Sequence, residues 1–318
     1  MRMPEQKSYV EPEDRATRVS DLVLRYGVIL GRRFSRGQKR RFLAAAAQQF
    51  ELCGFKASLE EDRCVVRLAG SKRFHNLYAG DLSRARAVFV TYYDTPVKAF
   101  GRRPVRAFDT NFRPTDAWVS MAGLAASVLL AVAFLALLVW PRIAVEGAFS
   151  VWGLLFLAVC VAVLALVTTC REGVAERENL VRNSSSLAVL FDLAREAQAA
   201  GLADRVAFAL VDEGCRSERG LEMLRSRLGR RGPKRVYVDS LGSDGRLVCL
   251  TNLRTPASWK GGVDVRALSA PDRKRFGDYL VCAASDADEE LTVNRASEVS
   301  VERVMARSDA LLELAESL

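Results

Sequence analysis

The side chains that most often carry out metal and acid–base chemistry are scarce in this sequence. Its 318 residues contain one histidine, His75, and seven cysteines, none of them in a Cys-x-x-Cys pair. Histidine is the commonest metal ligand and general base, and zinc ribbons need paired cysteines. The scattered, odd-numbered cysteines predict reduced thiols in a cytosolic compartment, and the single histidine argues against a histidine-rich metal centre.

One cysteine stands where a nucleophile could be activated. Cys215 follows an apolar run and precedes a helical pattern, a place where a helix dipole can lower the pKa of a thiol. A cysteine nucleophile also needs a base, and no histidine follows residue 75. We therefore expect no cysteine chemistry, and we interpret His75 as a structural or surface residue.

Composition is that of a globular protein with membrane segments. Half of the residues are hydrophobic and 27% are charged, with a net charge of +9. The sequence has no basic stripe interleaved with aromatic residues, so we expect no nucleic-acid partner. One basic run predicts a solvated helix face and turn, or a surface for anionic lipid headgroups. Its residues are Arg225, Arg227, Arg230, Arg231, Lys234 and Arg235.

Two uncharged stretches predict a transmembrane helical hairpin. Residues 117–140 and 148–170 are each long enough to cross a hydrocarbon core of ~30 Å, which needs about 20 helical residues. Residues 141–147, which include Pro141, predict the turn between them. Trp118, Trp140 and Trp152 lie near the ends of the spans, where indoles favour the interface.

The charges beside these spans predict their orientation. The turn holds only Arg142, beside Glu146, and we expect it outside, with both long flanks cytoplasmic in a multi-pass cell-membrane protein. Membrane lipid is therefore an expected partner. Residues 1–18 are charged throughout, so we expect no cleavable signal peptide. The basic flanking residues are Lys98, Arg102, Arg103, Arg106 and Arg113 before the first span and Arg171, Arg177 and Arg182 after the second.

The residues outside the hairpin predict one α/β domain in two parts, 1–116 and 171–318, with the hairpin (117–170) as an insertion. Apolar spacing predicts helices over 38–53, 218–228 and 301–315, and a helix through 187–197 with Asn183 or Ser184 as its N-cap. Strands are expected at 64–69, 74–79, 87–91, 206–211 and 235–238. Alternating strands and helices indicate a sheet covered by helices on both faces.

The order of these elements, together with the motifs at strand ends, resembles the co-catalytic di-zinc aminopeptidases. This family comprises the clan MH exopeptidases, relatives of glutaminyl cyclase. The closest likeness is to its bacterial membrane branch, which carries transmembrane helices after the first metal motif. The likeness spans residues 20–318 and implies the family's mixed sheet flanked by helices. The matching segments are Gly31-Arg32-Arg33-Phe34-Ser35, Asn76-Leu77-Tyr78-Ala79, Tyr92-Tyr93-Asp94-Thr95, Arg182-Asn183-Ser184-Ser185-Ser186 and Val238-Asp239-Ser240-Leu241-Gly242.

The resemblance implies where zinc ligands would stand, and most are lost. Tyr92 takes the place of the first histidine, while the supporting Asp94 remains. Arg182 takes the place of the bridging aspartate, and a cation there opposes binding of two dications. Asp239 matches a retained ligand, and the last histidine is absent.

The family's Glu-Glu pair is aligned less directly. Without a gap it falls on Gly214 and Cys215, which we favour, and with a two-residue gap it falls on Asp212 and Glu213. We therefore expect no zinc, no other cofactor and no catalytic residues. The resemblance then implies a pseudoenzyme that binds a peptide, a small ligand or a partner protein.

Arg182 carries the sharpest structural hypothesis. Its guanidinium would fill the space of the missing metals and pair with Asp94 and Asp239. The alternative is that Arg182 extends to the membrane surface or to solvent.

Two other functions remain open. A residual metal-dependent aminopeptidase or hydrolase would hold one magnesium, calcium or manganese ion with Asp94, Asp212, Glu213 and Asp239. A structural membrane-assembly protein would pack its first span through small residues, which are Ala122, Gly123, Ala125 and Ala126.

Overall fold

The computed structural model describes residues 14–66, 70–98, 105–109, 114–170, 173–176, 179–229, 232–287, 290–294 and 298–318. The chain divides into two compact units. The sheet unit comprises Met1–Pro96, Pro104–Asn111 and Arg177–Leu318, and the hairpin unit comprises Val97–Arg103 and Phe112–Glu176. Several residues of the sequence-based expectations lie outside the described ranges, namely Arg102, Arg103, Arg113, Arg171, Arg177, Arg230 and Arg231.

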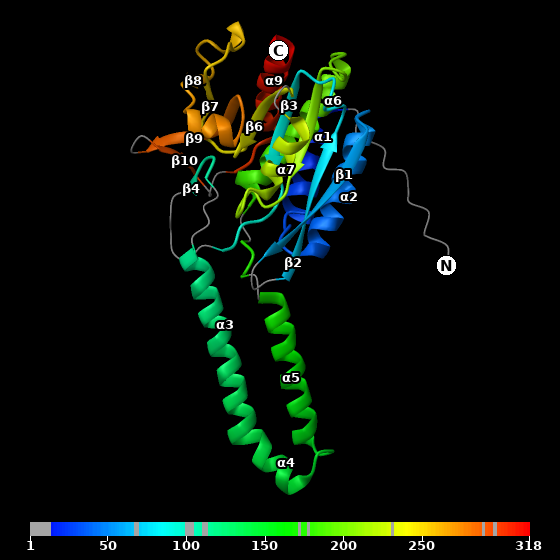
Figure 1. Ribbon diagram of the computed structural model, residues 1–318, viewed down its shortest axis with the longest axis vertical. Coiled ribbons are helices and arrows are strands. Elements are labelled where there is room, and N and C mark those ends of the chain that lie inside the picture. The colour runs from blue at the N-terminus through cyan, green and yellow to red at the C-terminus, as the bar shows by residue number, and fades with distance from the viewer. Residues whose placement is uncertain are drawn as a thin grey trace, which may run out of the picture. The chain divides into compact units, whose positions relative to one another are not determined.

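The described part of the sheet unit contains one mixed sheet of ten strands (Figure 1). Four strands are parallel to their neighbours, in the order β5 (Val206–Val211), β3 (Ala87–Tyr92), β6 (Lys234–Asp239), β9 (Tyr279–Ala287). Beyond β5, the antiparallel strand β2 (Gly70–Ala79) pairs with β5, and β1 (Ala57–Val66) pairs with β2. Beyond β9, β10 (Glu290–Val293) pairs with β9, and β4 (Val105–Arg106) pairs with β10. The strand β7 (Arg246–Thr251) also pairs with β9, and β8 (Asp264–Arg266) pairs with β7.

The central strands are buried on both faces because both faces are covered. In β3 and β5 every residue is buried, and alternate side chains enter different core clusters. Phe89 and Phe208 join the cluster on one face, while Val90 and Val211 join the cluster on the other. The predicted strands at 74–79, 87–91, 206–211 and 235–238 are confirmed. The one predicted at 64–69 overlaps the end of β1, and residues 67–69 lie outside the described ranges.

Helices cover both faces, which confirms the predicted α/β class. One face carries α1 (Arg15–Leu22), η1 (Val23–Ile29), α2 (Arg36–Leu52), α6 (Ser185–Ala199) and α9 (Val301–Ser317). The other face is covered by α7 (Arg219–Leu228) and by Phe276, just past α8 (Ala270–Arg275). The unit also contains a short 3₁₀ turn, η4 (Ala257–Trp259).

The start of α6 differs from the sequence prediction. A π-helical turn, η3 (Leu180–Ser184), runs directly into α6, and Ser184 has helical backbone angles without a side-chain cap. Asn183 and Ser184 are therefore not the predicted N-caps. Their side-chain oxygens instead accept hydrogen bonds from Arg33.

The hairpin unit contains two long apolar helical segments. The first is built from α3 (Pro114–Phe134), η2 (Leu135–Val139) and α4 (Trp140–Glu146), and the second is α5 (Val151–Cys170) (Figure 1). The candidate spans, Trp118–Glu146 and Val151–Cys170, have a mean hydropathy of 2.7 each, and only 6% and 0% of the residues in their apolar windows are buried. Both are long and apolar enough to cross a membrane.

The predicted turn at 141–147 is wrong, because the first helix continues to Glu146. Pro141 directly follows the π-helical turn η2, and the residues before it, Val139 and Trp140, have helical backbone angles, so the proline lies inside this helix and does not end it. The chain reverses instead at residues 147–150, beginning at Gly147 with φ of 89°, a left-handed conformation that favours glycine.

Candidate functional site

Parallel strands end at the same edge of a sheet, and this edge gathers the residues that the sequence singled out. We call the set the carboxyl-edge cluster. It follows β3, β5 and β6 and includes one residue of η3. All of its side chains are buried. The members are Tyr92, Asp94, Arg182, Asp212, Glu213, Cys215 and Asp239.

Asp239, the retained ligand of the resemblance, is held by neutral donors. The Tyr92 hydroxyl donates to Asp239 Oδ1 at 3.1 Å, and the Ser240 hydroxyl donates to the same oxygen at 3.0 Å. The Phe108 backbone N–H donates to Oδ2 at 3.0 Å. Both carboxylate oxygens therefore have partners inside the fold.

Arg182 lies in the cluster, but it does not make the predicted ion pairs. It is 7% exposed, so the surface or solvent location is excluded. Its guanidinium carbon lies 5.4 Å from the centre of the Tyr92 ring, and one of its nitrogens donates to the Asp109 carbonyl. Among the described residues no salt bridge joins Arg182 to Asp94 or Asp239. Asp239 already has its oxygens occupied, and the Tyr92 ring lies against the guanidinium instead.

Asp94 is the least satisfied carboxylate of the cluster. Its Oδ2 accepts from the Cys215 backbone N–H at 3.3 Å, while its buried Oδ1 has no hydrogen-bond partner within the described structure. Burial raises the pKa of Asp94 to about 6; Lys39 opposes the shift, and the nearby carboxylates of Glu213 and Asp212 add to it. Asp94 is therefore a buried acid whose charged form is costly.

Asp212 and Glu213 face two lysines that sequence reasoning did not single out. Lys39, from α2, places Nζ 2.5 Å from Asp212 Oδ1 and 3.1 Å from Glu213 Oε1. Lys72, from β2, places Nζ 3.0 Å from the same Glu213 oxygen. Burial alone would raise the pKa of the Glu213 carboxyl, but Lys39 and Lys72 lower it to about 2. Glu213 is thus ionised, and the ammonium groups of Lys39 and Lys72 lie against its charge.

The backbone of β2 fixes the other side of Asp212. The Oδ2 atom of Asp212 accepts from the His75 backbone N–H at 3.2 Å, and the backbone N–H of Asp212 donates to the Asn76 side-chain oxygen at 3.0 Å. The side chain of His75 itself points to Glu61, with Nδ1 3.8 Å from a carboxylate oxygen. The only histidine therefore contributes its backbone, and not its imidazole, to the cluster.

Arg33 donates hydrogen bonds to three segments near the cluster, namely η1 with the residue after it, η3, and the residue after β3. It is fully buried, and burial lowers the pKa of its guanidinium to about 10. The sequence flagged Arg33 within the Gly31–Ser35 motif but gave it no role. Its donors reach Tyr93 O at 2.5 Å, Tyr26 O at 2.7 Å, Leu30 O at 2.9 Å, Asn183 Oδ1 at 2.8 Å and Ser184 Oγ at 2.7 Å.

The side chains of this cluster do not fit zinc. A zinc site needs several deprotonated nitrogen, sulfur or carboxylate ligands around one point. Here Lys39 already bonds two of the carboxylates, and Arg182 adds a second cation. Burial raises the pKa of the Cys215 thiol well above its usual range, so it stays protonated. In the part of the chain that the structure describes, no three His, Cys, Asp or Glu side chains are grouped to hold a metal ion.

The same geometry bears on the oxygen-only metal site considered as an alternative. Asp212 and Glu213 bond Lys39, Asp239 bonds Tyr92, and Asp94 faces the Cys215 backbone. These four carboxylates lie in one cluster but do not converge on a common point within the described residues.

Known structures share this fold. The chain is similar to a Zn-dependent exopeptidase from Parabacteroides distasonis, with a TM-score of 0.57 and 9% identity over 96% of this chain and 99% of that one. It is also similar to a glutaminyl cyclase from Tannerella forsythia, with a TM-score of 0.54 and 11% identity over 95% of this chain and 98% of that one. A third similar structure is BSAP, a zinc aminopeptidase from Bacillus subtilis, with a TM-score of 0.54 and 8% identity over 97% of this chain and 96% of that one. No protein-family model and no curated protein sequence matches. The predicted zinc-aminopeptidase-like fold is confirmed.

Replacing Asp94 with asparagine is expected to stabilise the protein at neutral pH. The folded-state pKa of about 6 lies above the ordinary value of 3.8, so the buried charge costs stability above pH 6. That cost disappears as the pH falls from about 6 to below about 4, where both states bind the proton. Asp94→Asn should therefore gain about 1–3 kcal/mol at pH 7.5 and nothing at pH 3.5, measured by thermal unfolding in detergent. A variant no more stable than wild type at pH 7.5 would contradict this view of Asp94.

Proposed function

We propose that this chain, which has the fold of zinc exopeptidases and glutaminyl cyclases, is a catalytically inactive membrane-anchored protein that acts as a binding or regulatory module. One observation carries the proposal. The Lys39 ammonium group lies between Asp212 and Glu213, at 2.5 and 3.1 Å. A cation that belongs to the chain is always present at these carboxylates, so a metal ion would have to displace it before it could bind.

Arg182 supports the same conclusion at the other side of the cluster. By resemblance, its position is that of the carboxylate that bridges two zinc ions. A guanidinium there repels a dication, and its packing against the buried Tyr92 ring leaves it no route to solvent without a rearrangement. Fixed positive charge from the chain itself therefore lies at both sides of the cluster.

Turnover assays test the inactivity. The detergent-purified protein would be offered a panel of aminoacyl fluorogenic substrates and an N-terminal glutaminyl peptide, with and without added zinc. The zinc aminopeptidase from Bacillus subtilis serves as the positive control. We expect no hydrolysis and no cyclisation above the blank. Zinc-dependent turnover that Asp239→Ala abolishes would overturn the proposal.

The binding role requires a surface other than the cluster itself. Every cluster side chain is at most 7% exposed. A peptide or small ligand therefore cannot contact Asp94 or Asp239 in this conformation. The module is proposed to bind its partner through exposed surfaces of the sheet unit, with the cluster as a structural element.

The proposed location is the cell membrane, with two spans and both flanks cytoplasmic. The two long apolar helices support the spans, and the basic residues of the flanking sequence support the orientation. Phe149, at the tip of the hairpin, is fully exposed, and Ser83 lies on the surface of the sheet unit.

Cysteine labelling tests this orientation. In a background with Cys160 and Cys170 replaced by serine, a membrane-impermeant maleimide should label Phe149→Cys in intact cells. Ser83→Cys should be labelled only after the cells are permeabilised. The reverse pattern would place the flanks outside.

A further inference from the structure

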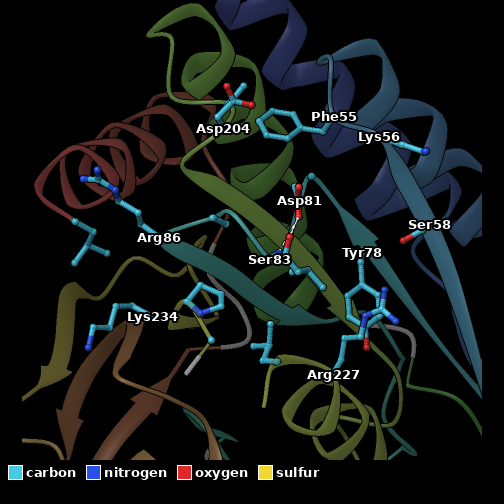
Figure 2. Close-up of a pocket in the computed structure, with 18 of the residues that line it drawn as sticks. Phe55, Lys56, Ser58, Tyr78, Asp81, Ser83, Arg86, Asp204, Arg227 and Lys234 are labelled. Carbon is cyan, nitrogen blue, oxygen red and sulfur yellow. Dashed lines mark hydrogen bonds between the residues drawn. The ribbon is translucent and has the colours of Figure 1, made fainter. Parts of the chain in front are cut away.

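A basic groove lies at the opposite edge of the parallel strands, where β3, β5 and β6 begin. A cleft of about 930 Å³ is lined by residues that precede these strands, among them Arg86, Asp204 and Lys234 (Figure 2). A second cleft of about 560 Å³ shares Lys234 and its neighbours Leu228, Gly232 and Pro233 with the first. We call the joined clefts the amino-edge groove.

Positive charge dominates this groove. The smaller cleft is lined by five cationic side chains and by the single carboxylate of Asp278. That carboxylate is already engaged, since it bonds Arg273 at 3.1 Å and accepts from the Arg235 backbone N–H at 3.2 Å. The larger cleft adds the cations of Lys56, Arg86 and Arg227, together with the carboxylates of Asp81 and Asp204 (Figure 2). The cationic residues of the groove are Lys56, Arg86, Arg225, Arg227, Lys234, Arg235, Arg273 and Lys274.

Arg235 carries the argument for a ligand. One of its terminal guanidinium nitrogens is buried and has no hydrogen-bond partner among the described residues, while the other donates to the Arg273 carbonyl at 3.4 Å. Burial and the charges of Arg225 and Arg273 lower the pKa of Arg235, and Asp278 opposes this shift. Arg235 lines the smaller cleft beside Arg225 and Arg273, and an anion bound in that cleft would offset the repulsion among these like charges.

The chemistry of the groove selects the kind of anion. Guanidinium groups bind phosphate oxygens in a bidentate manner, and several cations around one hollow suit a ligand with more than one negative charge. Phe55 and Tyr78 line the larger cleft but are buried, so they offer no free ring for stacking on a base. The groove therefore favours phosphate groups without a nucleobase.

We propose that the amino-edge groove is a binding site for a phosphate-bearing anion, either a free oligophosphate or the phosphate of a lipid headgroup. This site does not depend on the loss of zinc, because it lies at the other edge of the sheet and shares no residue with the carboxyl-edge cluster.

Isothermal titration of the full-length protein in neutral detergent tests the site. Sodium tripolyphosphate is the probe for a free anion, and dihexanoyl phosphatidylglycerol below its micellar concentration is the probe for a headgroup. We expect saturable binding of one of these probes, weakened by salt. Arg235→Gln should lower its affinity at least about tenfold, because a hydrogen bond to a charged group is lost.

Matched variants keep the test decisive. Lys260→Gln removes an exposed cation that lines neither cleft and should leave the affinity unchanged. If Arg235→Gln does not fold, the double variant Arg225→Gln/Lys274→Gln, at two residues that line the same smaller cleft, replaces it. Preference for tripolyphosphate assigns the free anion, and preference for the phospholipid assigns the headgroup. No binding of either probe, or equal binding by wild type and groove variants, overturns the proposal.

Discussion

Lys39→Met is expected to lower the free energy of unfolding by about 3–5 kcal/mol, because it leaves two buried carboxylates without their shared cation. Lys39 is 12% exposed in its side chain, and its partners Asp212 and Glu213 are 2% and 5% exposed. Methionine preserves the length and most of the packing of the side chain, so the loss reports the charge. Denaturant unfolding of the purified protein in detergent measures it.

Lys72→Met is the matched control for this experiment. Lys72 is 30% exposed and contacts only one of the two carboxylates, so its loss should cost about 1 kcal/mol. Divalent cations should partly restore the stability of Lys39→Met and leave wild type unchanged. Equal stability of Lys39→Met and wild type would show that Asp212 and Glu213 need no cation.

The same ion pairs predict a pH dependence of opposite sign to that of Asp94. The folded-state pKa of Glu213, about 2, lies below the ordinary value of 4.5. Its ionic stabilisation is therefore complete above about pH 4.5 and is lost as the pH falls toward 2. The stability difference between wild type and Lys39→Met should shrink over that range.

Arg33→Lys is expected to destabilise the protein by about 3–5 kcal/mol, although the charge is kept. The guanidinium of Arg33 makes five hydrogen bonds, and a lysine ammonium has only three donors from one atom. At least two buried acceptors would lose their charged partner. Thermal unfolding in detergent measures the loss.

Arg32→Lys is the control beside it in sequence. Arg32 is exposed, and the same chemical change there should alter stability by less than about 0.5 kcal/mol. A small effect of Arg33→Lys, equal to that of Arg32→Lys, would contradict the role of Arg33 as the residue that joins η1, η3 and the end of β3.

The sheet and the hairpin were predictable because their signals are local. The all-apolar run of β5 indicates a strand covered on both faces, and two charge-free stretches indicate long apolar helices. The end of the first apolar helix was not predictable. Proline usually ends or kinks a helix, but Pro141 follows the π-helical turn η2 within a helix that continues to Glu146.

The sequence predicted which residues belong to the carboxyl-edge cluster, but it did not predict which side chains they contact. The resemblance pointed to residues at strand ends, and the structure gathers them at one edge. The contact of Lys39 with Asp212 was not predicted, because Lys39 stands among Arg36, Arg40 and Arg41 on α2. A basic residue in such a run is expected to face solvent. Nothing in the helical period distinguishes the one cation that turns inward. Such a partner is visible only once α2 is packed against the sheet.

The local backbone leaves no room for a side chain at Gly214. A Cβ atom built on Gly214 would lie 2.3 Å from the Cβ of Tyr92, so no side chain fits there beside this tyrosine. Every residue except glycine carries a Cβ at position 92, so a histidine there would meet the same close approach. A carboxylate at position 214 would therefore require the backbone to shift.

The metal content of the purified protein tests the central claim most directly, namely that cations of the chain itself replace the two zinc ions. The detergent-purified protein would be dialysed against micromolar zinc, then against zinc-free buffer, and analysed by inductively coupled plasma mass spectrometry. We predict zinc far below one ion per chain, unchanged by Asp239→Ala. Near-stoichiometric zinc that Asp239→Ala removes would contradict the account and restore a metallopeptidase function.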